Sequence, residues 1–200
     1  MPPFIRQLHE IDQNITLAIN DLHSAFLDQV AIFLSDIKVW IPFYIIVGAI
    51  FVKKFGWKRG AVVIISLGLT FALTDQLTNL VKDCVSRLRP CYNTHMLDEG
   101  LRILEKRGGL YGFYSAHAAN AFGFALCSIV CLKMDRTKRY PFFSVLVLSW
   151  ATLVAFSRIL IGKHYFGDVV VGTVVGIIIG TALALLARAV ISRYIKTESC

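Results

Sequence analysis

Charged residues are scarce in this 200-residue sequence, and acidic residues are the scarcer kind. Lysine and arginine number 21 against 13 aspartates and glutamates, and the four types together make up 17% of the chain. Hydrophobic residues account for 56%, and the mean hydropathy is +0.63. This balance lies outside the range of ordinary soluble domains.

The apolar residues are gathered into runs instead of being spread as amphipathic stripes. Five runs approach or reach the length of about 20 residues that a bilayer-spanning helix needs. They are Val39 to Val52, Ala61 to Val81, Ala116 to Leu132, Phe142 to Phe156 and Val169 to Ile191. A shorter run, Ala25 to Leu34, is expected to cross with help from its flanking residues. The sequence therefore predicts an all-α fold, a six-helix integral membrane bundle.

Cysteine is too sparse to indicate a disulfide framework or a metal site. Cys127 and Cys131 stand one turn apart within an apolar run, where they serve as small apolar residues. Cys84 and Cys91 flank a charged segment, and a bridge between these two is left open. The fifth, Cys200, does not match a prenylation motif.

The deficit of acidic residues leaves a net charge of +8, which could indicate a nucleic-acid partner. The positive charges, however, fall in the gaps between apolar runs, as they do in the cytoplasmic loops of membrane proteins. They are Lys53, Lys54, Lys58 and Arg59; Lys133, Arg136, Lys138 and Arg139; and Arg193 and Lys196. A six-span threading puts all three groups on one side, and the positive-inside rule makes that side cytoplasmic. We therefore expect no nucleic-acid partner.

Residues 3 to 22 differ from the rest because their apolar residues recur every three or four positions, with polar residues between them. The apolar ones are Phe4, Leu8, Ile11, Ile15, Ala18, Ile19 and Leu22. This pattern predicts an amphipathic helix that lies along the membrane surface. The expected organisation is an interfacial helix over 1–22, a six-helix domain over 23–195 and a cytoplasmic tail over 196–200.

Three short strings hold most of the remaining ionisable residues, and each lies at the end of an apolar run. They are Lys82-x6-Arg89-Pro90, Ser115-Ala116-His117 and Ser157-Arg158-x5-His164-x3-Asp168. Ionisable side chains near membrane helices are costly and usually functional. The threading brings all three strings to the face opposite the basic loops, so we expect them to form one site.

The strings contain what is needed to hold and attack a phosphate. Lys82, Arg89 and Arg158 supply cations for its oxygens. Ser115 is expected to cap the helix that follows, so that the amide of Ala116 points at an anion; a cap with no ligand is the alternative.

His164 and Asp168 are four residues apart and would share a face of a helix. A carboxylate bonded to one imidazole nitrogen fixes the tautomer and leaves the other nitrogen free to attack. His117 is then the natural general acid. Asp75, further back along the same helix as Lys82, is expected to make a hydrogen bond between helices, or else to orient Lys82.

These residues resemble the tripartite motif of the type 2 phosphatidic acid phosphatase superfamily. The first and third strings match its pattern in full, whereas the middle string reads Tyr114-Ser115-Ala116-His117 where the family usually has Pro-Ser-Gly-His. The resemblance implies a metal-independent membrane lipid phosphatase with no cofactor. In that family's mechanism His164 forms a phosphohistidine, Asp168 orients it and His117 protonates the leaving group, while Lys82, Arg89, Ser115, Ala116 and Arg158 hold the phosphate.

We expect a bacterial cytoplasmic-membrane enzyme whose site faces the periplasm. Its partners would be the bilayer and a lipid phosphate or diphosphate: undecaprenyl diphosphate, a lipid A phosphate, phosphatidylglycerophosphate or phosphatidic acid. The alternatives are a lipid-linked phosphotransferase and a non-catalytic scaffold or lipid transporter. The oligomeric state is left open. The loop from Cys91 to Tyr114 is expected to contain a short helix with Leu97, Leu101 and Leu104 on one face, either a lid or an ordinary interfacial helix.

Overall fold

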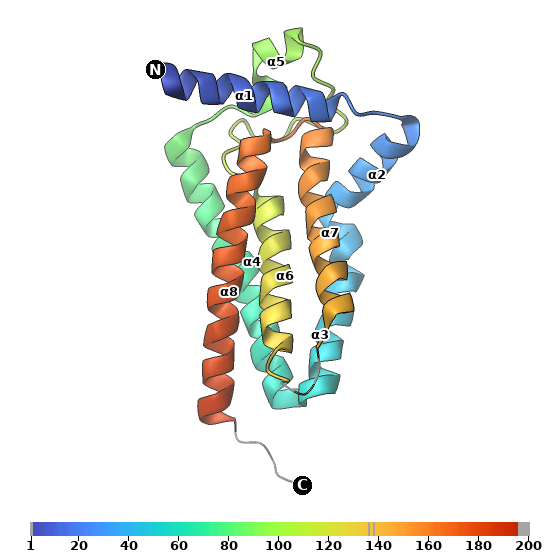
Figure 1. The fold of residues 1–200 in the computed structure, drawn as a ribbon, viewed down its shortest axis with the longest axis vertical. Coiled ribbons are helices and arrows are strands. Elements are labelled where there is room, and N and C mark those ends of the chain that lie inside the picture. The colour runs from blue at the N-terminus through green and yellow to red at the C-terminus, as the bar shows by residue number, and fades with distance from the viewer. Residues whose placement is uncertain (1, 136, 138, 196–200) are drawn as a thin grey trace.

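The protein is built from helices that form an upright bundle, with one further helix lying across its end (Figure 1). The computed structural model describes residues 2–135, 137 and 139–195. Its elements are α1 (Pro3–Asn20), α2 (Ala25–Ser35), the 3-10 turn η1 (Ile37–Trp40), α3 (Ile41–Phe55), α4 (Trp57–Val85), η2 (Pro90–Tyr92), α5 (Thr94–Asp98), α6 (Ala116–Leu132), α7 (Pro141–Leu160) and α8 (Phe166–Tyr194). The all-α prediction is confirmed.

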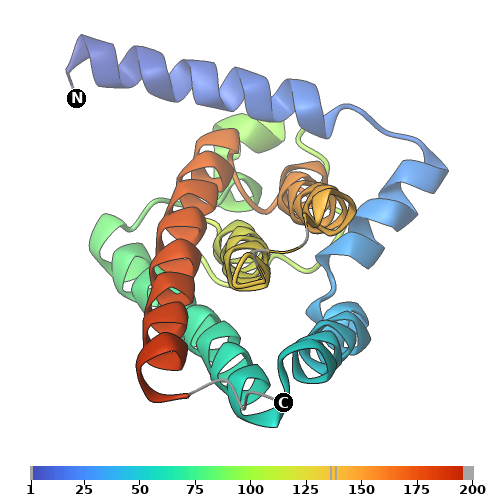
Figure 2. The same ribbon diagram turned by 60° about the horizontal axis from the view of Figure 1, so that its bottom comes forward.

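Helix α6 lies inside the bundle, enclosed by its neighbours (Figure 2). It packs most extensively against α8, and then against α7 and α4. Most of its residues are buried, including Phe124, which makes edge-to-face contacts with the aromatic rings of Tyr44 and Trp150. Because α6 begins with the middle sequence string, the interior of the bundle fixes where that string lies.

The contact between α6 and α8 depends on a row of glycines four residues apart, Gly172, Gly176 and Gly180. A Cβ atom on each would lie between 2.2 and 2.4 Å from a carbonyl oxygen of the facing α6 strip, which begins at Ser115. Small residues let membrane helices approach this closely and pack well. The row therefore sets the distance between α8 and the N-terminal half of α6.

The predicted number of six spans is not exact. Helices α4, α7 and α8 are long and apolar enough to cross a bilayer, and α6 is a shorter apolar helix. Helix α2 has 11 residues, about 16 Å at the rise of an α-helix, which is too short for a separate crossing. It joins α3 through a 69° bend, and the two together have the length and apolarity of one broken span.

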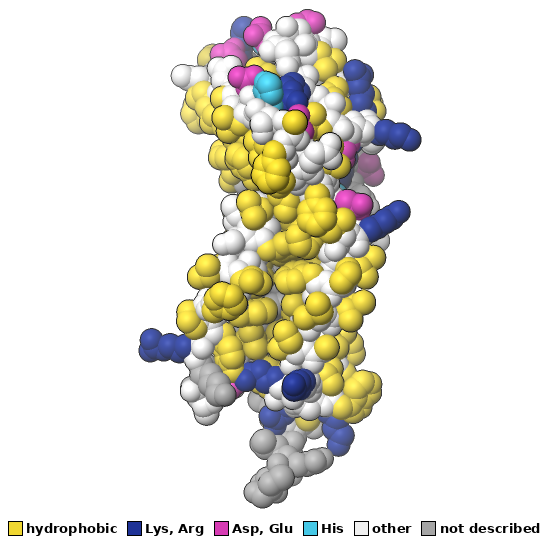
Figure 3. Space-filling view, turned by 90° about the vertical axis from the view of Figure 1, so that its right-hand side faces the viewer, with side chains coloured by type: hydrophobic (Ala, Val, Ile, Leu, Met, Phe, Trp, Pro, Cys, Tyr) yellow, Lys and Arg dark blue, Asp and Glu magenta, His cyan; other side chains and the backbone are white. Residues whose placement is uncertain are grey.

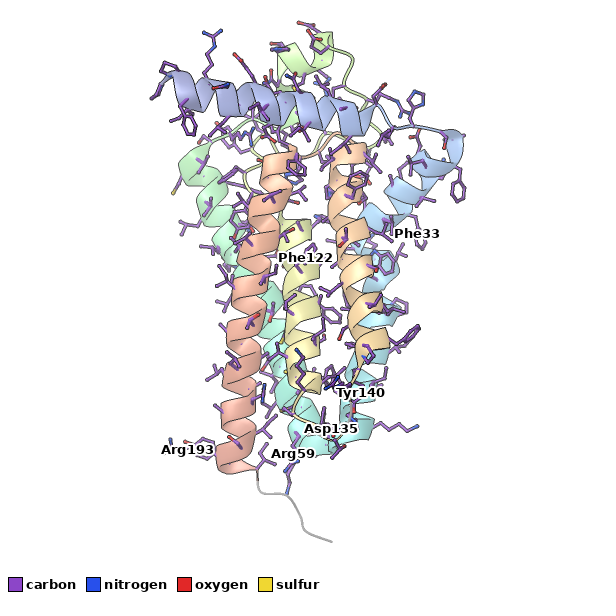
Figure 4. All side chains as sticks on the ribbon, viewed as in Figure 1. Phe33, Arg59, Phe122, Asp135, Tyr140 and Arg193 are labelled. Carbon is purple, nitrogen blue, oxygen red and sulfur yellow. The ribbon has the colours of Figure 1, made fainter. Side chains whose placement is uncertain are left out.

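With α2 and α3 as one broken span, α1 and the C-terminal end of α8 lie at opposite ends of the bundle. A six-span threading puts α1 beside the C-terminal tail, whereas α1 lies at the other end of the bundle, over α7 and α8 (Figure 1). The basic loops do gather at the end away from α1, where Figure 4 shows Arg59, Asp135 and Arg193. There Lys54 Nζ lies 2.7 Å from Asp135 Oδ2. Arg136, Lys138 and Lys196, also assigned to this end, lie outside the described residues.

Helix α1 has its apolar side facing outward. Phe4 and Leu8 are 69% and 50% exposed, whereas Thr16 and Asn20 are buried against the bundle. The Asn20 amide holds the helix end by donating to the carbonyls of Ile159 and Leu160, at 3.1 and 2.8 Å. An outward apolar face suits a helix that lies in the membrane interface. On the face seen in Figure 3, hydrophobic side chains cover the middle of the molecule and charged ones gather toward its ends.

The loop between α4 and α6 covers the same end as α1. Its helix α5 ends at Asp98, before the Leu101 and Leu104 positions that the sequence pattern assigned to a helix, and Leu101 is buried instead. Arg102 secures the segment through a charged pair with Asp28 of α2. Cys84 and Cys91, left open above, are both free thiols.

Candidate active site

The three sequence strings meet at the end of the bundle that α1 covers. Their residues come from the ends of α4, α6, α7 and α8 and from the loops between these helices. Lys82 lies in the last turn of α4, Arg89 just before η2, Ser115 to His117 at the start of α6, Arg158 in the last turn of α7, His164 in the α7–α8 loop and Asp168 in the first turn of α8. His117 and His164 lie within electrostatic range of each other and of Arg158 and Lys82.

His164 and Asp168 face each other across a turn, and not along one helix as the sequence suggested. Helix α8 begins at Phe166, after His164. The turn is made possible by Gly162, whose φ of +74° favours glycine, and whose added Cβ would lie 2.5 Å from the Arg102 carbonyl oxygen. His164 Nδ1 is 3.5 Å from Asp168 Oδ2, which also accepts the Tyr165 N–H at 3.0 Å.

The imidazole of His164 is buried and surrounded by cations. It is 2% exposed, and among the described residues its Nδ1 has no hydrogen-bond partner. Burial, followed by the charges of Arg158, Arg89 and Lys82, holds the pKa of His164 well below the ordinary value of 6.5. A neutral imidazole is the form that can act as a nucleophile.

Two guanidinium groups line the site with donors to spare. Arg158 is 5% exposed and donates to the Ser35 hydroxyl through Nη1. Its Nε is buried and, in the described part of the chain, has no partner. Arg89 donates from Nε to the Tyr111 carbonyl at 3.1 Å, which fixes the side chain at one edge. A buried donor without a partner is unusual in a folded protein, and an anion bound in the site would accept a hydrogen bond from the Nε of Arg158.

Ser115 caps α6, as the sequence predicted. Its backbone is extended, and its Oγ accepts the Ala118 N–H at 3.4 Å. Its own N–H donates to the Asp168 carbonyl at 3.0 Å, which ties the start of α6 to the start of α8. The amides of Ala116 and His117 follow in the first turn, where helix N–H groups have no partner within the helix. They are available to an anion at the positive end of the helix dipole.

An apolar cavity of about 320 Å³ opens beside His117. It is lined by Leu34, Ser35, Ile37, Trp40, Ile41, Tyr44, Phe71, Asp75, His117, Asn120, Ala121 and Val154. Asp75 Oδ1 accepts the Asn120 amide at 2.8 Å, which is the hydrogen bond between helices that the sequence suggested. The cavity can hold hydrocarbon next to a histidine of the site.

Two charged residues of the site escaped the sequence analysis. Arg87 Nη1 donates to Asp168 Oδ1 at 2.7 Å, and Arg87 Nη2 donates to Asp12 Oδ2 at 2.7 Å. Arg87 is one of the six unspecified positions between Lys82 and Arg89, and this location is the only feature of the sequence that could have pointed to it. Asp12 lies on the polar face of the N-terminal helix, and no spacing in the sequence connects it to Asp168.

Lys163, the residue before His164, does not stand free beside a phosphate. Its Nζ donates to the Lys106 carbonyl, so it holds the α4–α6 loop against the site. Within the described ranges, no three His, Cys, Asp or Glu side chains are grouped as metal ligands would be. The polar groups that converge here are cations, the imidazoles of His117 and His164, backbone amides, and the carboxylates of Asp168 and Asp12.

Such a site, at the end of an apolar helical bundle and beside an apolar cavity, defines a class of membrane proteins that act on lipid-linked anions. Comparison with known sequences then gives the family. The sequence profile of the PAP2 superfamily matches residues 63–192. The chain belongs to this superfamily, and the resemblance seen in the three strings is confirmed.

Two relatives carry the same name. The lipid A 4'-phosphatase of Bacteroides thetaiotaomicron is 33% identical over 174 residues, which cover 86% of this chain and 75% of the relative. The lipid A 4'-phosphatase of Porphyromonas gingivalis is 28% identical over 172 residues, covering 86% and 70%. The predicted class, a membrane lipid phosphatase and thus a phosphoric ester hydrolase, is confirmed.

Two solved structures share the fold. A transmembrane PAP2-type phosphatidylglycerolphosphate phosphatase from Bacillus subtilis superposes with a TM-score of 0.69 at 21% identity, covering 96% of this chain and 90% of its own. LpxE of Aquifex aeolicus gives a TM-score of 0.60 at 22% identity, covering 86% and 93%. Both support the arrangement of the helices.

Proposed function

We propose that this enzyme removes a phosphate from a saccharide lipid of the lipid A type. The observation that carries the proposal is the position of His117, which lines the apolar cavity on one side and lies within electrostatic range of His164 and Arg158 on the other. A lipid whose chains fill the cavity would present its phosphate to the cations. The two relatives named lipid A 4'-phosphatases favour this substrate over the other lipid phosphates considered above.

The proposed reaction begins with attack by His164. With a proton on Nδ1 facing Asp168, the lone pair of Nε2 forms a bond to phosphorus while the bond to the lipid oxygen breaks. His117 gives its proton to the departing oxygen. Water then attacks the phosphohistidine, the P–N bond breaks, and His117 takes the proton from water. The products are a lipid alcohol and inorganic phosphate.

The cations would stabilise the negative charge of the phosphate without forming covalent bonds to it. Lys82, Arg89 and Arg158 would hold the non-bridging oxygens, and Arg158 has the unsatisfied Nε described above. Phosphoryl transfer depends mainly on positioning and on stabilising this spread charge. Ser115 and the Ala116 amide would complete the cradle at the start of α6.

The membrane orientation is part of the proposal. We place the protein in a bacterial cytoplasmic membrane with the site toward the periplasm, since the basic loops lie at the opposite end and mark the cytoplasmic side. The amphipathic α1 would then rest in the outer interface.

A direct test is phosphate release by the purified protein in excess chelator. We expect release from a lipid A phosphate, measured against a panel that contains undecaprenyl diphosphate, phosphatidylglycerophosphate and phosphatidic acid. A strict need for a divalent ion, or no release from any of the four, would contradict the proposal. A phosphohistidine that turns over only when an acceptor lipid is added would point instead to a phosphotransferase.

The environment of His164 predicts that activity survives mild acid. Because the pKa of His164 is lowered, protonation that removes the nucleophile occurs at a pH below the ordinary value of 6.5. The acid limb of kcat/KM should therefore have its midpoint below 6.5, after correction for ionisation of the lipid phosphate. A midpoint at or above 6.5 would show that His164 is not held in its neutral form.

A further inference from the structure

We propose that Asp12 of α1, acting through Arg87, is a positioning residue for the Asp168–His164 pair. The inference rests on the proposed function, because it assigns a role within the same reaction. It reaches beyond the three sequence strings, since it connects the N-terminal helix to the catalytic carboxylate. We call Asp12 and Arg87 the brace.

Arg87 joins two carboxylates with one guanidinium. Its Nη1 lies 2.7 Å from Asp168 Oδ1 and its Nη2 lies 2.7 Å from Asp12 Oδ2. The guanidinium carbon also lies 4.0 Å from the centre of the Tyr165 ring, on which it rests. A planar group held at both ends and on one face has little freedom to turn.

Asp12 binds the start of α8 in addition to binding Arg87. Its second oxygen, Oδ1, accepts the Gly167 N–H at 2.6 Å, and Thr16 Oγ1 accepts the neighbouring Phe166 N–H at 3.0 Å. Gly167 allows this approach, because a Cβ there would lie 3.0 Å from Asp12 Oδ2. The polar face of α1 thus supplies acceptors to the first amides of the helix that carries Asp168.

The brace gives the two carboxylate oxygens of Asp168 different partners. Arg87 occupies Oδ1, which leaves Oδ2 with the Tyr165 N–H and the Nδ1 atom of His164. Asp168 is fully buried, and a buried carboxylate deprived of its cation is strongly disfavoured. Loss of the brace should therefore let the carboxylate turn and release the histidine from a single tautomer.

His9 completes the surroundings of the brace on the α1 side. Its Nδ1 lies 3.3 Å from Arg87 Nη2, and burial followed by the charge of Arg87 lowers the pKa of His9. A neutral imidazole adds an acceptor to the guanidinium without competing for its charge. The pair formed by Asp12 and Arg87 remains the only route from α1 to Asp168 through charged groups among the described residues.

The test compares Asp12→Asn and Arg87→Gln with a matched control on the same helix, Glu10→Gln. Glu10 is exposed and pairs only with Arg6, at 3.1 Å, in the part of the chain described. We expect each brace variant to lower kcat for a lipid phosphate by about 10- to 100-fold, with KM changed less than threefold, because the brace does not touch substrate. Glu10→Gln should behave as wild type.

A second measurement separates positioning from stability and does not depend on turnover. In protein labelled with ¹⁵N-histidine, and assigned with His164→Ala, the His164 ring should show a single Nδ1–H tautomer in wild type. We expect a mixture of tautomers in Asp12→Asn. An unchanged tautomer in that variant, or a loss of activity no greater than that of Glu10→Gln, would overturn the proposal. If wild type hydrolyses no lipid phosphate, the proposed function fails while the tautomer still decides the brace.

Discussion

Replacing His164 by alanine is expected to lower the rate of phosphate release by at least about 10⁴-fold. We expect no substitute for this nucleophile, because the other histidine of the site, His117, lies in the first turn of α6 and lines the apolar cavity. Lipid binding should persist, since the cations and the cavity are unchanged. The measurement is kcat on the best lipid of the panel, together with a binding curve for the same lipid.

A matched control for this change is His95→Ala. His95 lies in α5 with an exposed side chain, outside the group of residues that surrounds His164. It should leave kcat unchanged. Activity in His164→Ala within tenfold of wild type would exclude the phosphohistidine route, and would shift attention to direct attack by water.

Replacing Gly176 by alanine should be strongly disruptive, as should the same change at Gly180, where the added Cβ would meet an equally close carbonyl oxygen. At Gly176 the new Cβ would lie 2.2 Å from the Ala119 carbonyl oxygen, and a backbone atom cannot move aside as a flexible side chain can. Overpacking of this kind costs about 1–3 kcal/mol. Because α6 carries His117 and α8 carries Asp168, separating the helices should also lower activity by about tenfold or more. Both effects can be followed by thermal unfolding and phosphate release in one detergent.

Gly68→Ala is the control for a methyl group added to a membrane helix. Gly68 lies in α4, and apart from its chain neighbours and the backbone of its own helix, no described atom lies within 4 Å of the position its Cβ would take. Alanine is also the better helix former, by up to about 1 kcal/mol. The variant should match wild type or exceed it in stability. Equal stability of the Gly176 and Gly68 variants would show that the close contact of α6 with α8 is not needed.

The sequence was sufficient for the residues that spacing defines. Runs of apolar residues predicted the helices, and charges at their ends predicted which side chains would meet. Ser115 could be identified as a cap because a short polar residue before an apolar run has one common structural role. The strings at Lys82–Pro90 and Ser157–Asp168 needed no structure to be recognised.

What the sequence could not give were contacts that no local pattern encodes. The bend between α2 and α3 depends on how two short helices pack, and it changes the number of crossings by one and with it the side on which α1 lies. The bond between Asp12 and Arg87 joins positions 75 residues apart. The glycine row from Gly172 to Gly180 was visible in the sequence, but its partner helix was not.

Helix α1 has consequences for how the membrane acts on the enzyme. Its outer side, which includes Phe4 and Leu8, is exposed. Its inner side accepts hydrogen bonds from the first amides of α8. With α1 in the interface, as proposed above, lateral pressure in the headgroup region would act on the hydrogen bonds that α1 makes to the start of α8. In the orientation proposed above, the turn that carries His164 would be connected to the membrane interface through α1, so the packing of the surrounding lipids would be one of the determinants of its geometry.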